Sequence, residues 1–443
     1  MTDPANTPVL IVGAGITGLA AGTWLAGRGY PVKILEASDR PGGRAITITR
    51  PDGSGDRVDA GTQYYHTNYR LARSLIREAG LAPRLTRVRG KTRFFDDRAP
   101  GGTFTTGHRI PTIRAKGMLG NLYLTIRGLA RMARRPISPY AARPYPAIDA
   151  LSVDRAMPDP FEHEFTARTL ITAGALIEPG AGAGFDVSYL HLIRLMWIVL
   201  MTDYLVLEGG TDSLHRALAE RLDVTYGAKA DHLIWEDNRA RGVVLADGTR
   251  MEATQVILAT PPAATARLLP GDWQDAQQFL EAIPHPPAVI VTLFLDRALE
   301  PGVWSYIFRP DPARLVSMCV DAAQKCPAMV PSGRAALQAW ICWPAAGPAG
   351  DMEDTALIEA VLADLAPSFP GLADQIRETH IQRHAEAVPQ SPPGHAEAAC
   401  GFLAGLDQRA GVEICGDFLS GGYMESALWS AHRAITRIDG DHS

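Results

Sequence analysis

The chain has 443 residues, of which 46% are hydrophobic and 21% are charged, and its formal net charge is −5 at pH 7. Single hydrophobic cores tend to stop growing near about 250–300 residues, so this length predicts two domains. The composition is that of an ordinary globular protein, and the sequence has neither a polybasic nor an acidic tail. We therefore expect no nucleic-acid partner.

The cysteines and the N-terminus bear on the cellular compartment. The five cysteines show neither C-x-x-C nor metal-ligand spacing, so we expect no disulfide framework and no metal site. Residues 1–4 carry no basic group and lead directly to an apolar run and glycines, unlike a signal peptide. The apolar stretch 190–207 contains Arg194 and Asp203, which predicts a buried helix followed by a strand rather than a membrane span. These features predict a cytoplasmic protein.

Residues 9–29 follow the pattern of a dinucleotide-binding unit. An apolar strand at 9–12 is followed by the motif G-x-G-x-x-G and an apolar helix that ends near Gly29. In such a unit the first glycine makes a tight turn, the second lets the backbone approach a pyrophosphate, and the third lets the helix pack close to the strand. The N–H groups that begin the helix then face the phosphates. The predicted ligand contacts are Gly13, Gly15, Ile16, Thr17 and Gly18.

A second strand, at residues 31–35, ends at Glu36, about twenty residues after the glycines. A carboxylate at this position accepts both ribose hydroxyls of an adenosine and disfavours a 2′-phosphate. The order of strand, glycines, helix, strand and acid makes a Gly-rich turn without a ligand the weaker interpretation. This motif alone does not separate NAD from FAD.

Residues 36–44 read E-A-S-D-R-P-G-G-R. They resemble the E-x-x-x-R-x-G-G-R signature of the flavoprotein amine oxidase superfamily, which includes monoamine oxidases, protoporphyrinogen oxidases and phytoene desaturases. The resemblance implies FAD and an α/β fold, with a Rossmann-type FAD-binding domain like that of p-hydroxybenzoate hydroxylase and glutathione reductase and an α+β substrate domain. It also implies that the Gly-Gly-Arg turn wraps the FAD diphosphate. The cofactor contacts predicted here are Glu36, Ala37, Arg40, Gly42, Gly43 and Arg44.

Residues 58–65 resemble the D-x-G strand that returns beside the isoalloxazine in this family. The resemblance implies that Gly61 and Thr62 contact the flavin and that Gln63 and Tyr64 lie on its substrate side. Gln63 and Tyr64 are therefore candidate catalytic residues. The alternative is that Tyr64 and Tyr65 are half-buried strand residues, since strands favour aromatic side chains in any case.

Residues 412–427 resemble the closing motif of the family, in which a strand ends in Gly-Asp and a loop leads to G-Y-M-E-G-A at the start of a helix. The resemblance assigns the ribityl contact to Asp417, next to Gly416, and a backbone contact near the flavin to Met424. It makes Tyr423 both a cofactor contact and a candidate catalytic residue, at the position of one aromatic of an amine cage. A helix N-terminus here would stabilise the negative charge of a reduced flavin. Ser426 departs from the family's glycine.

The middle of the chain alternates between the two predicted domains. Residues 207–214 resemble the family's return to the FAD-binding domain, and the backbone near Ala230 would flank the adenine. Residues 246–249 indicate a hairpin, and strands at 288–295 and 336–343 indicate the substrate-domain sheet. We predict an FAD-binding domain made of residues 1–70, 206–265 and 396–443, and a substrate domain made of a helical part, 71–205, and a sheet part, 266–395.

Residues 109–135 carry seven basic residues and no acid, interleaved with apolar residues at helical spacing. A helix of this kind could rest on anionic lipid, or it could cap the substrate domain with a solvated basic face. We favour the cap helix and expect no membrane contact, because the net charge is negative. The glycines at 180–184 do not follow a strand, so we expect a loop there and no second dinucleotide site. The electrons would then come from the substrate.

Monoamine oxidases hold their amine between two aromatic residues, place a lysine near flavin N5, and often tether the flavin to a cysteine. In this chain residues 386–391 offer no second aromatic, and valine stands on the strand 289–291 where the lysine is expected. No cysteine directly precedes residues 392–394. We therefore expect FAD to be bound without a covalent link.

The resemblance implies an FAD-dependent oxidase or dehydrogenase that oxidises a C–N or C–C bond of a small organic, biosynthetic-type substrate by hydride transfer to flavin N5. O2 or another electron acceptor would reoxidise the flavin. The alternative is a non-redox isomerase or a desaturase that acts on a hydrophobic, isoprenoid-like substrate. A homodimer stays open. Further candidates, each equally open to a structural role, are the possible bases His66, His384 and His395 and the substrate contacts Arg194 and Trp197.

Overall fold

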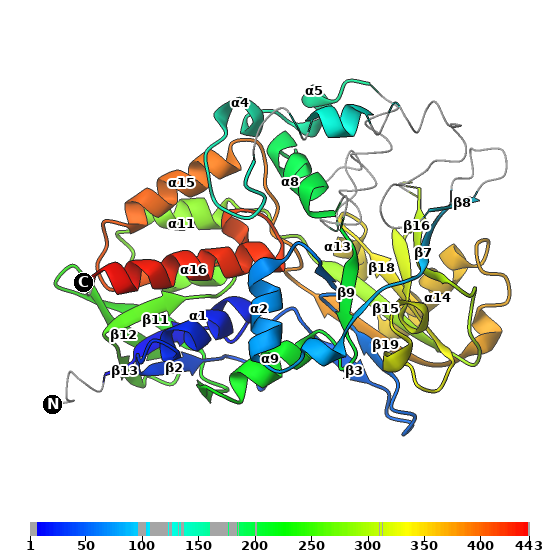
Figure 1. Cartoon of the computed structure of the whole chain (residues 1–443), viewed down its shortest axis with the longest axis horizontal. Coiled ribbons are helices and arrows are strands. Elements are labelled where there is room, and N and C mark those ends of the chain that lie inside the picture. Colours follow the sequence, from blue (N-terminus) through cyan, green and yellow to red (C-terminus); the bar gives the residue numbers. More distant parts are fainter. Residues whose placement is uncertain are drawn as a thin grey trace.

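A five-stranded parallel sheet forms one half of the molecule in the computed structural model (Figure 1). Its strand order is β10-β2-β1-β14-β20, and every neighbouring pair is parallel. The central strands β1 and β14 are buried throughout, which explains why they read as continuous apolar runs. The bounds are Val9–Val12 (β1), Val32–Leu35 (β2), Asp223–Thr225 (β10), Gln255–Leu258 (β14) and Val412–Ile414 (β20).

The sheet thus joins strands from the beginning, the middle and the end of the chain. The structure describes residues 7–95, 103–106, 123, 126–131, 133, 137–159, 176, 184, 186–199, 202–309, 311 and 313–441.

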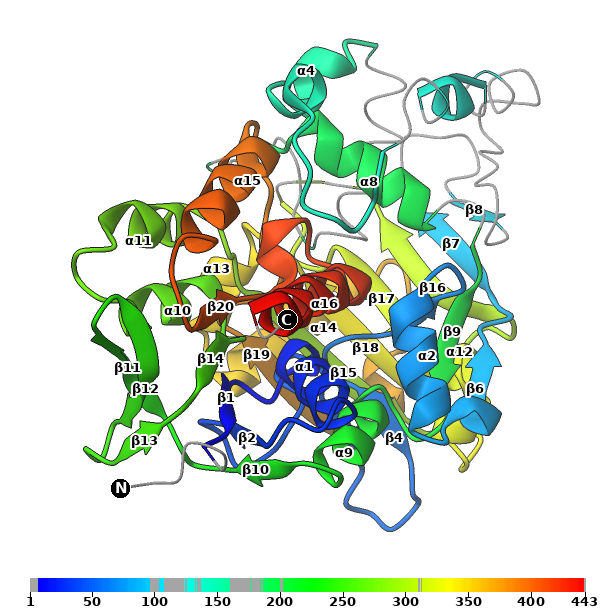
Figure 2. The same ribbon diagram turned by 60° about the vertical axis from the view of Figure 1, so that its left-hand side comes forward.

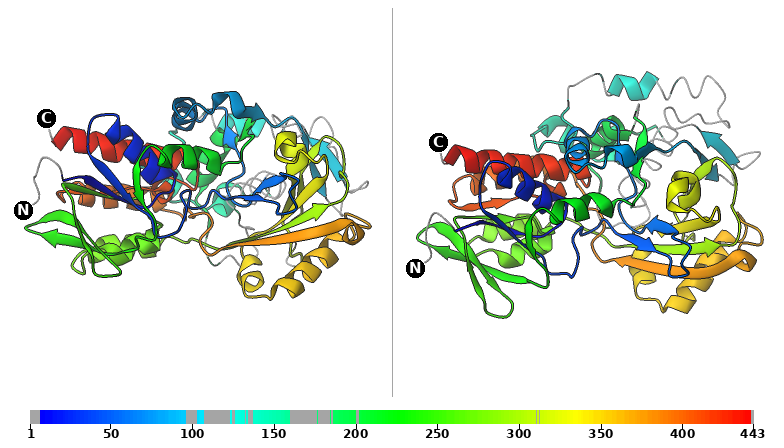
Figure 3. Two further views of the ribbon diagram at one scale, coloured as in Figure 1. Left: turned by 90° about the horizontal axis from the view of Figure 1, so that it is seen from below. Right: turned by 60° about the horizontal axis from the view of Figure 1, so that its bottom comes forward.

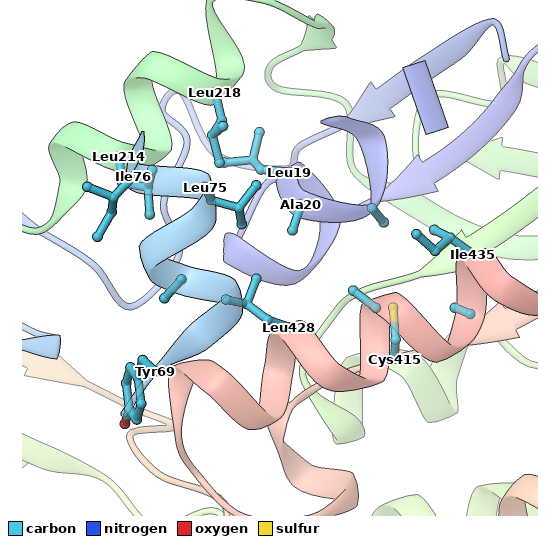
Figure 4. Packing of buried hydrophobic residues seen from close by; sticks show 14 of the residues in the cluster. Leu19, Ala20, Tyr69, Leu75, Ile76, Leu214, Leu218, Cys415, Leu428 and Ile435 are labelled. Atoms are coloured by element: carbon cyan, nitrogen blue, oxygen red, sulfur yellow. The ribbon is translucent and has the colours of Figure 1, made fainter. Parts of the chain in front are cut away.

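Two helices from opposite ends of the chain cover one face of the parallel sheet. α1 (Ile16–Ala26) and α16 (Met424–Asp441) pack against each other, and Figure 2 shows them side by side. Leu19 of α1 and Leu428 of α16 lie in one buried cluster with Leu75 of α2 (Arg70–Glu78), as Figure 4 shows. The first and last segments of the chain therefore share one core.

The other face of the parallel sheet is covered by a hairpin layer and three helices. The antiparallel strands β11 (Ala230–Glu236), β12 (Arg239–Leu245) and β13 (Arg250–Glu252) form a small sheet, so the hairpin expected at residues 246–249 is confirmed. Leu10 and Leu258 of the parallel sheet share a core cluster with Trp273 and Phe402. The helices are α10 (Pro262–Leu268), α11 (Gln274–Glu281) and α15 (His395–Leu406).

A seven-stranded sheet forms the other half of the molecule, with the order β19-β15-β18-β17-β16-β7-β8. β15 lies between β19 and β18 in antiparallel register, and its eight residues are all buried. Figure 3 shows α13 (Ala346–Gly350) and α14 (Asp354–Leu365) on one side of this sheet. The strands are Lys91–Phe95 (β7), Thr103–Thr106 (β8), Ala288–Leu295 (β15), Val303–Phe308 (β16), Met318–Asp321 (β17), Ala335–Ile341 (β18) and Ile376–His384 (β19).

Strands β7 and β8 correct our prediction for the substrate half. We had expected residues 71–205 to be helical, but β7 pairs with β16 in parallel and adds two strands from this part of the chain to the sheet. A short strand of this part, β6 (Leu85–Arg87), pairs with β9 (Tyr204–Leu207), and so does β5 (Tyr65–His66), which precedes it in the chain. These segments are short and locally polar, so they lack the apolar alternation that identifies a strand.

The stretch 190–207 forms the expected helix and strand, α8 (Tyr189–Val199) and β9. Most of α8 is buried, including Arg194. Within the described residues, no helix is long and apolar enough to span a bilayer. The expected basic helix at 109–135 lies mostly outside the described residues, as does the expected glycine loop at 180–184.

Candidate active site

A cavity of about 1070 Å³ lies between the two halves of the molecule. One end is bounded by the carboxyl ends of β1 and β2, the edge at which open α/β sheets bind ligands. The other end is bounded by side chains from the seven-stranded sheet. Of the predicted cofactor contacts, those that line the cavity are Gly13, Gly15, Ile16, Thr17, Glu36, Ala37, Gly42, Gly43, Arg44, Gly61, Thr62, Ala230, Gly416, Asp417, Tyr423 and Met424.

The glycine motif brings backbone groups to the first end of the cavity. Gly13 has a φ of +105°, a conformation that side chains disfavour. α1 begins at Ile16, and no side chain caps its first N–H groups, which leaves them for a ligand. Gly18 does not line the cavity: a Cβ there would lie 2.0 Å from Gly13 O. Gly18 therefore permits the close packing of helix on strand that its place in the motif predicts, and it lies behind the residues that line the cavity.

Glu36 ends β2 with its carboxylate held by neighbouring groups. Oε2 accepts a hydrogen bond from Ala14 N at 2.7 Å, and Oε1 accepts from Ser38 N at 2.9 Å and from Ser38 Oγ at 2.8 Å. A carboxylate oxygen has further lone pairs, so these bonds orient the group without exhausting it. Glu36 is therefore a fixed acceptor at the rim of the cavity.

The loop from Arg40 to Arg44 divides its tasks between two arginines. Arg40 does not line the cavity; its guanidinium donates to Gly43 O at 2.9 Å, Pro41 O at 3.1 Å and Ala45 O at 3.2 Å, and so holds the turn together. In this structure Arg40 thus supports the turn, whereas the predicted contact with the cofactor stays a prediction. Arg44 does line the cavity, and its Nη2 lies 2.8 Å from Asp417 Oδ2. This ion pair joins the N-terminal loop to the end of β20.

The C-terminal segment closes the cavity beside Tyr423. Gly422 has no room for a side chain, because a Cβ would lie 2.3 Å from Val388 Cγ1. Glu425 is fully buried and accepts hydrogen bonds from the backbone N–H groups of residues 70, 71 and 72, which begin α2. Glu425 therefore satisfies the first N–H groups of α2 from a distant segment of the chain, a role that the sequence did not predict.

Tyr423 lies over the cavity with its ring stacked on His191, with centroids 5.8 Å apart and planes at 15°. Tyr423 Oη is 3.4 Å from His191 Nε2. Burial lowers the pKa of His191 to about 3, so the histidine is neutral at pH 7, and burial raises the pKa of Tyr423. Both groups are thus uncharged, and His191 fixes the tyrosine rather than ionising it.

Aromatic side chains form the other end of the cavity. The rings of Tyr64 and Tyr204 lie 4.5 Å apart, and Trp304 lies 5.6 Å from Tyr204 and 6.0 Å from Tyr64. Met318 and Trp340 extend this apolar wall. The described lining residues at this end, from β5, β7, β9, β16, β17, β18 and α8, include no Lys, Arg, Asp or Glu.

The remaining candidates separate into those at the cavity and those away from it. His66 lines the cavity, bonds to Thr202 Oγ1 through Nδ1 at 3.1 Å, and has its pKa lowered to about 3 by burial. His384 also lines it, with Nε2 2.7 Å from Ala60 O.

Three candidates do not reach the cavity. His395 Nε2 lies 2.7 Å from Phe418 O. Arg194 donates to Ser420 O at 2.8 Å and to Ala141 O at 3.1 Å, and Trp197 is 37% exposed. None of the three is among the described lining residues, so the structure does not bring them together with the other candidates.

Gln63 and Lys325 differ most from expectation. Gln63 lines the cavity, but its amide is bound elsewhere: Oε1 accepts from Lys325 Nζ at 2.8 Å, and Nε2 donates to Asp59 O at 2.5 Å and to Gly61 O at 3.1 Å. Lys325 is not among the residues predicted from the sequence, where the family's lysine is expected on the strand 289–291. The one available signal was an isolated lysine within the apolar segment 316–330.

A parallel sheet with a glycine-rich turn, an acid at the end of β2 and a cavity at the carboxyl ends of the strands is typical of the Rossmann-like α/β class of dinucleotide-binding proteins. The family model described as "Flavin containing amine oxidoreductase" matches residues 16–438. The chain belongs to this family and is a flavin-dependent oxidoreductase.

Relatives within the family act on different substrates. The chain is 24% identical to the 15-cis-phytoene desaturase of Capsicum annuum, over 98% of this chain and 78% of the relative. It is 25% identical to the coproporphyrinogen III oxidase of Propionibacterium freudenreichii, over 98% of this chain and 91% of the relative. The fold is similar to that of cyclohexylamine oxidase from Brevibacterium oxydans, with a TM-score of 0.75 and 19% identity over 98% of this chain and 99% of that one.

Proposed function

We propose that this protein binds FAD without a covalent link and uses it to oxidise a C–N or C–C bond of an uncharged, largely apolar organic molecule. Glu36 and Ala230 would hold the adenosine, and α1 and the turn 42–44 the diphosphate. Asp417 would contact the ribityl chain. The observation that carries the proposal is the single cavity that brings these groups together with an aromatic end. The predicted domain division, residues 1–70, 206–265 and 396–443 against 71–205 and 266–395, is kept in this proposal except for residues 266–283, which pack on the parallel sheet and are moved to the first domain. The FAD-binding domain would be of the p-hydroxybenzoate hydroxylase and glutathione reductase type.

The fit of the cavity to FAD rests on its backbone. Gly13 has a positive φ, and a Cβ on Gly13 would lie 2.7 Å from Ala259 O. A Cβ on Gly61 would lie 2.0 Å from Arg44 O. These two glycines are required by the close packing of the chain at the cavity wall, whereas a Cβ on Gly15 would meet no atom within 4 Å, so the backbone there is open to an extended ligand. None of the five cysteines is among the described lining residues, which supports a non-covalent cofactor.

The bound flavin supplies a two-electron acceptor for a hydride that leaves a substrate carbon. The chain supplies position and environment. Tyr64, Tyr204 and Trp304 present flat apolar surfaces against which a substrate can be held, and they exclude water from the reacting atoms. Met424 begins α16 at the cavity, so the N-terminal N–H groups of this helix favour negative charge there.

The described residues at the aromatic end of the cavity include no Lys, Asp or Glu that could act as a strong base. His66 is neutral at pH 7, and its Nδ1 is bonded to Thr202. His384 is bonded through Nε2 to Ala60 O, and burial lowers its pKa. Direct transfer of a hydride from a C–H bond needs no protein base at that carbon, which agrees with this lining. Oxidation of a C–N bond in this way leaves an iminium ion, whereas oxidation of a C–C bond also releases a proton from the neighbouring carbon, which would pass to solvent. O2 or another acceptor would then reoxidise the cofactor.

The aromatic end also supports a second candidate, a desaturase or a non-redox isomerase of an isoprenoid-like substrate. Moving a neutral polar group without a hydrogen-bond partner from water to an apolar site costs on the order of 2–7 kcal/mol. Moving an ammonium or a carboxylate there costs more. The described lining residues at this end provide no charge to offset that cost. An uncharged hydrocarbon meets no such penalty.

Anaerobic titration tests the proposal. The purified protein should be yellow, release FAD on denaturation, and lose its flavin absorption near about 450 nm when mixed with its substrate. The panel contains amines, porphyrinogens and isoprenoids. Bleaching by an isoprenoid or another uncharged C–H donor supports the proposal, and recovery in air identifies O2 as acceptor. Turnover without any acceptor would favour the isomerase. A colourless protein that does not take up added FAD would contradict the assignment.

A further inference from the structure

A buried lysine links the seven-stranded sheet to the turn that lines the cavity. Lys325 ends α12 (Ala322–Lys325), which follows β17, and its side chain is 0% exposed. Its Nζ donates to Gln63 Oε1 at 2.8 Å, to Asp59 Oδ2 at 3.1 Å and to Gln63 O at 3.3 Å. An ammonium has three N–H donors, so these three acceptors satisfy it.

Asp59 balances the charge of this lysine. Its Oδ1 accepts hydrogen bonds from Thr211 N at 2.8 Å, Thr47 Oγ1 at 2.9 Å and Thr211 Oγ1 at 3.1 Å. The carboxylate is 1% exposed, so both charges are out of water and depend on each other. The pair is electrically neutral beside the cavity, and its influence on the site must come mainly through geometry.

Lys325 decides which way the Gln63 amide points. An ammonium can only donate, so the amide must present its oxygen to Lys325 and its nitrogen to the opposite side. There Nε2 donates to Asp59 O at 2.5 Å and to Gly61 O at 3.1 Å. Gln338 Nε2 also donates to Asp59 O, at 2.9 Å. The turn 59–63 is therefore held from the seven-stranded sheet by two side chains.

The opposite surface of the same turn faces the cavity. Gly61, Thr62 and Gln63 are lining residues, and Tyr64 follows directly. The turn is also confined by the loop of Arg44, because Thr62 N donates to Arg44 O at 3.1 Å and a Cβ on Gly61 would lie 2.0 Å from that oxygen. A turn fixed from both sides transmits a small displacement at Lys325 to the wall of the cavity.

We infer that Lys325 is a positioning residue for the reaction: through Gln63 and Asp59 it sets the turn 59–63 against the cofactor and substrate. This inference rests on the proposed function. Lys325 is not among the lining residues and its three donors are occupied, so it moves no proton. It reaches the site from α12, whereas the strand β15 carries Val289 and Val291, both buried.

The test removes the contacts between Lys325 and the turn 59–63 without leaving an unpaired buried charge. Lys325→Met alone would strand Asp59, so the variant of choice is Asp59→Asn with Lys325→Met. A matched control is Lys33→Met with Asp223→Asn, an ion pair at 3.0 Å on the exposed side of the parallel sheet that does not touch the turn. Gln63→Leu, which keeps the ion pair, is the second probe. Each variant is measured for melting temperature, flavin absorption spectrum, and rate of anaerobic reduction with the substrate dissociation constant.

We expect the paired variant and Gln63→Leu to stay folded and to bind flavin, but with a shifted flavin band and reduction slowed by about tenfold or more, since small misplacements carry costs of this order. The substrate dissociation constant should change less. The two changes combined should lose no more than either alone, because they act through one turn. The control pair should match the wild type.

Opposite results overturn the inference. A folded paired variant with the spectrum and the reduction rate of the wild type would make Lys325 purely structural. If the paired variant does not fold, an unchanged spectrum and rate in Gln63→Leu has the same meaning. The spectrum needs no turnover, so the inference can fail while the proposed function stands. A wild-type protein that takes up no flavin contradicts the proposed function first, and this inference with it.

Discussion

The two ends of the cavity are lined by different kinds of chemical groups. The end beside β1 and β2 consists of backbone and charge, with glycines at the turns and the ion pair of Arg44 and Asp417. The end beside the seven-stranded sheet consists of aromatic and aliphatic side chains, among them Tyr204 and Trp304, and its described residues carry no formal charge. Phosphates and hydroxyls need donors and charge, whereas an apolar substrate needs only shape and the exclusion of water.

This difference explains why the sequence predicted the lining of one end of the cavity and not that of the other. A close backbone approach demands glycine at set spacings, so the first end leaves a motif in the sequence. Aromatic residues from β9, β16 and β18 fit many folds equally well, and nothing in their local pattern shows that they converge. Substitutions at each end of the cavity can therefore test separately whether the two ends bind different parts of the ligands.

Replacing Gly18 should have the largest effect. Its Cβ would lie 2.0 Å from the backbone oxygen of Gly13, so Gly18→Ala should cost more than about 3 kcal/mol of stability, the upper end of ordinary overpacking. Gly15→Ala is the matched variant: nothing lies within 4 Å of its Cβ and its φ is −70°. It should keep its stability in urea unfolding but bind less flavin per protein. Equal stability of the two variants would argue against the packing role of Gly18.

The second largest effect is expected from removing the charge of Asp417, which should weaken flavin binding at the end of the cavity beside β1 and β2. Asp417→Asn removes the charged acceptor proposed for the ribityl chain, which we expect to cost about 2 kcal/mol of flavin binding, or roughly 30-fold in the flavin dissociation constant, and it also breaks the ion pair with Arg44. The flavin content is measured after dialysis against increasing volumes of buffer. Titration of the apoprotein with flavin then gives this dissociation constant. Glu413→Gln, which breaks an ion pair with Arg437 away from the cavity, serves as the control. Unchanged flavin affinity in Asp417→Asn would remove this residue from the cofactor site.

A charge placed at the aromatic end should affect the substrate alone. Met318 lines the cavity and is 8% exposed. Met318→Glu should weaken the binding of an uncharged substrate by about tenfold, because the carboxylate must stay hydrated, while flavin binding is unchanged. Met318→Leu keeps the apolar surface and should behave like the wild type. Improved binding of an uncharged ligand by the glutamate variant would contradict an apolar site.

Acid should destabilise the protein through His66. Its pKa falls from an ordinary 6.5 to about 3 on folding, so the unfolded chain binds the additional proton between these pH values and stability declines as pH falls from 6.5 towards 3. At pH 5.5 this amounts to about 1 kcal/mol. His66→Phe should therefore show a shallower loss of stability between pH 7 and pH 4.5, measured by urea unfolding. His232→Phe, at an exposed position of β11, is the control for the substitution itself.

The smallest effect is expected at Trp197, which lies outside the cavity. Trp197 is 37% exposed, so Trp197→Ala should change stability by less than about 0.5 kcal/mol and leave the rate of flavin reduction unchanged. Reduction kinetics and a melting curve suffice to check this. A marked loss of activity would restore Trp197 as a substrate contact.

The sequence was most informative where one residue type is required by backbone geometry. The glycines, Glu36 and the Gly-Asp of residues 416–417 identified the family, the flavin and the parallel sheet, and the family match confirms that recognition. The segments 190–207 and 246–249 were also predicted correctly from their pattern. These features are local, or repeat spacings that are typical of the fold.

Only the tertiary structure decided what each polar side chain contacts. Arg40 and Arg44 belong to one motif, yet one supports the turn and the other lines the cavity. Gln63 lies at the cavity while its amide is held by Lys325, more than 260 residues away in the chain. Such contacts depend on two distant segments meeting in three dimensions. Sequence spacing determined where a dinucleotide is cradled, and the packing of the two halves determined the rest, because hydrogen-bond partners are set by proximity in space rather than along the chain.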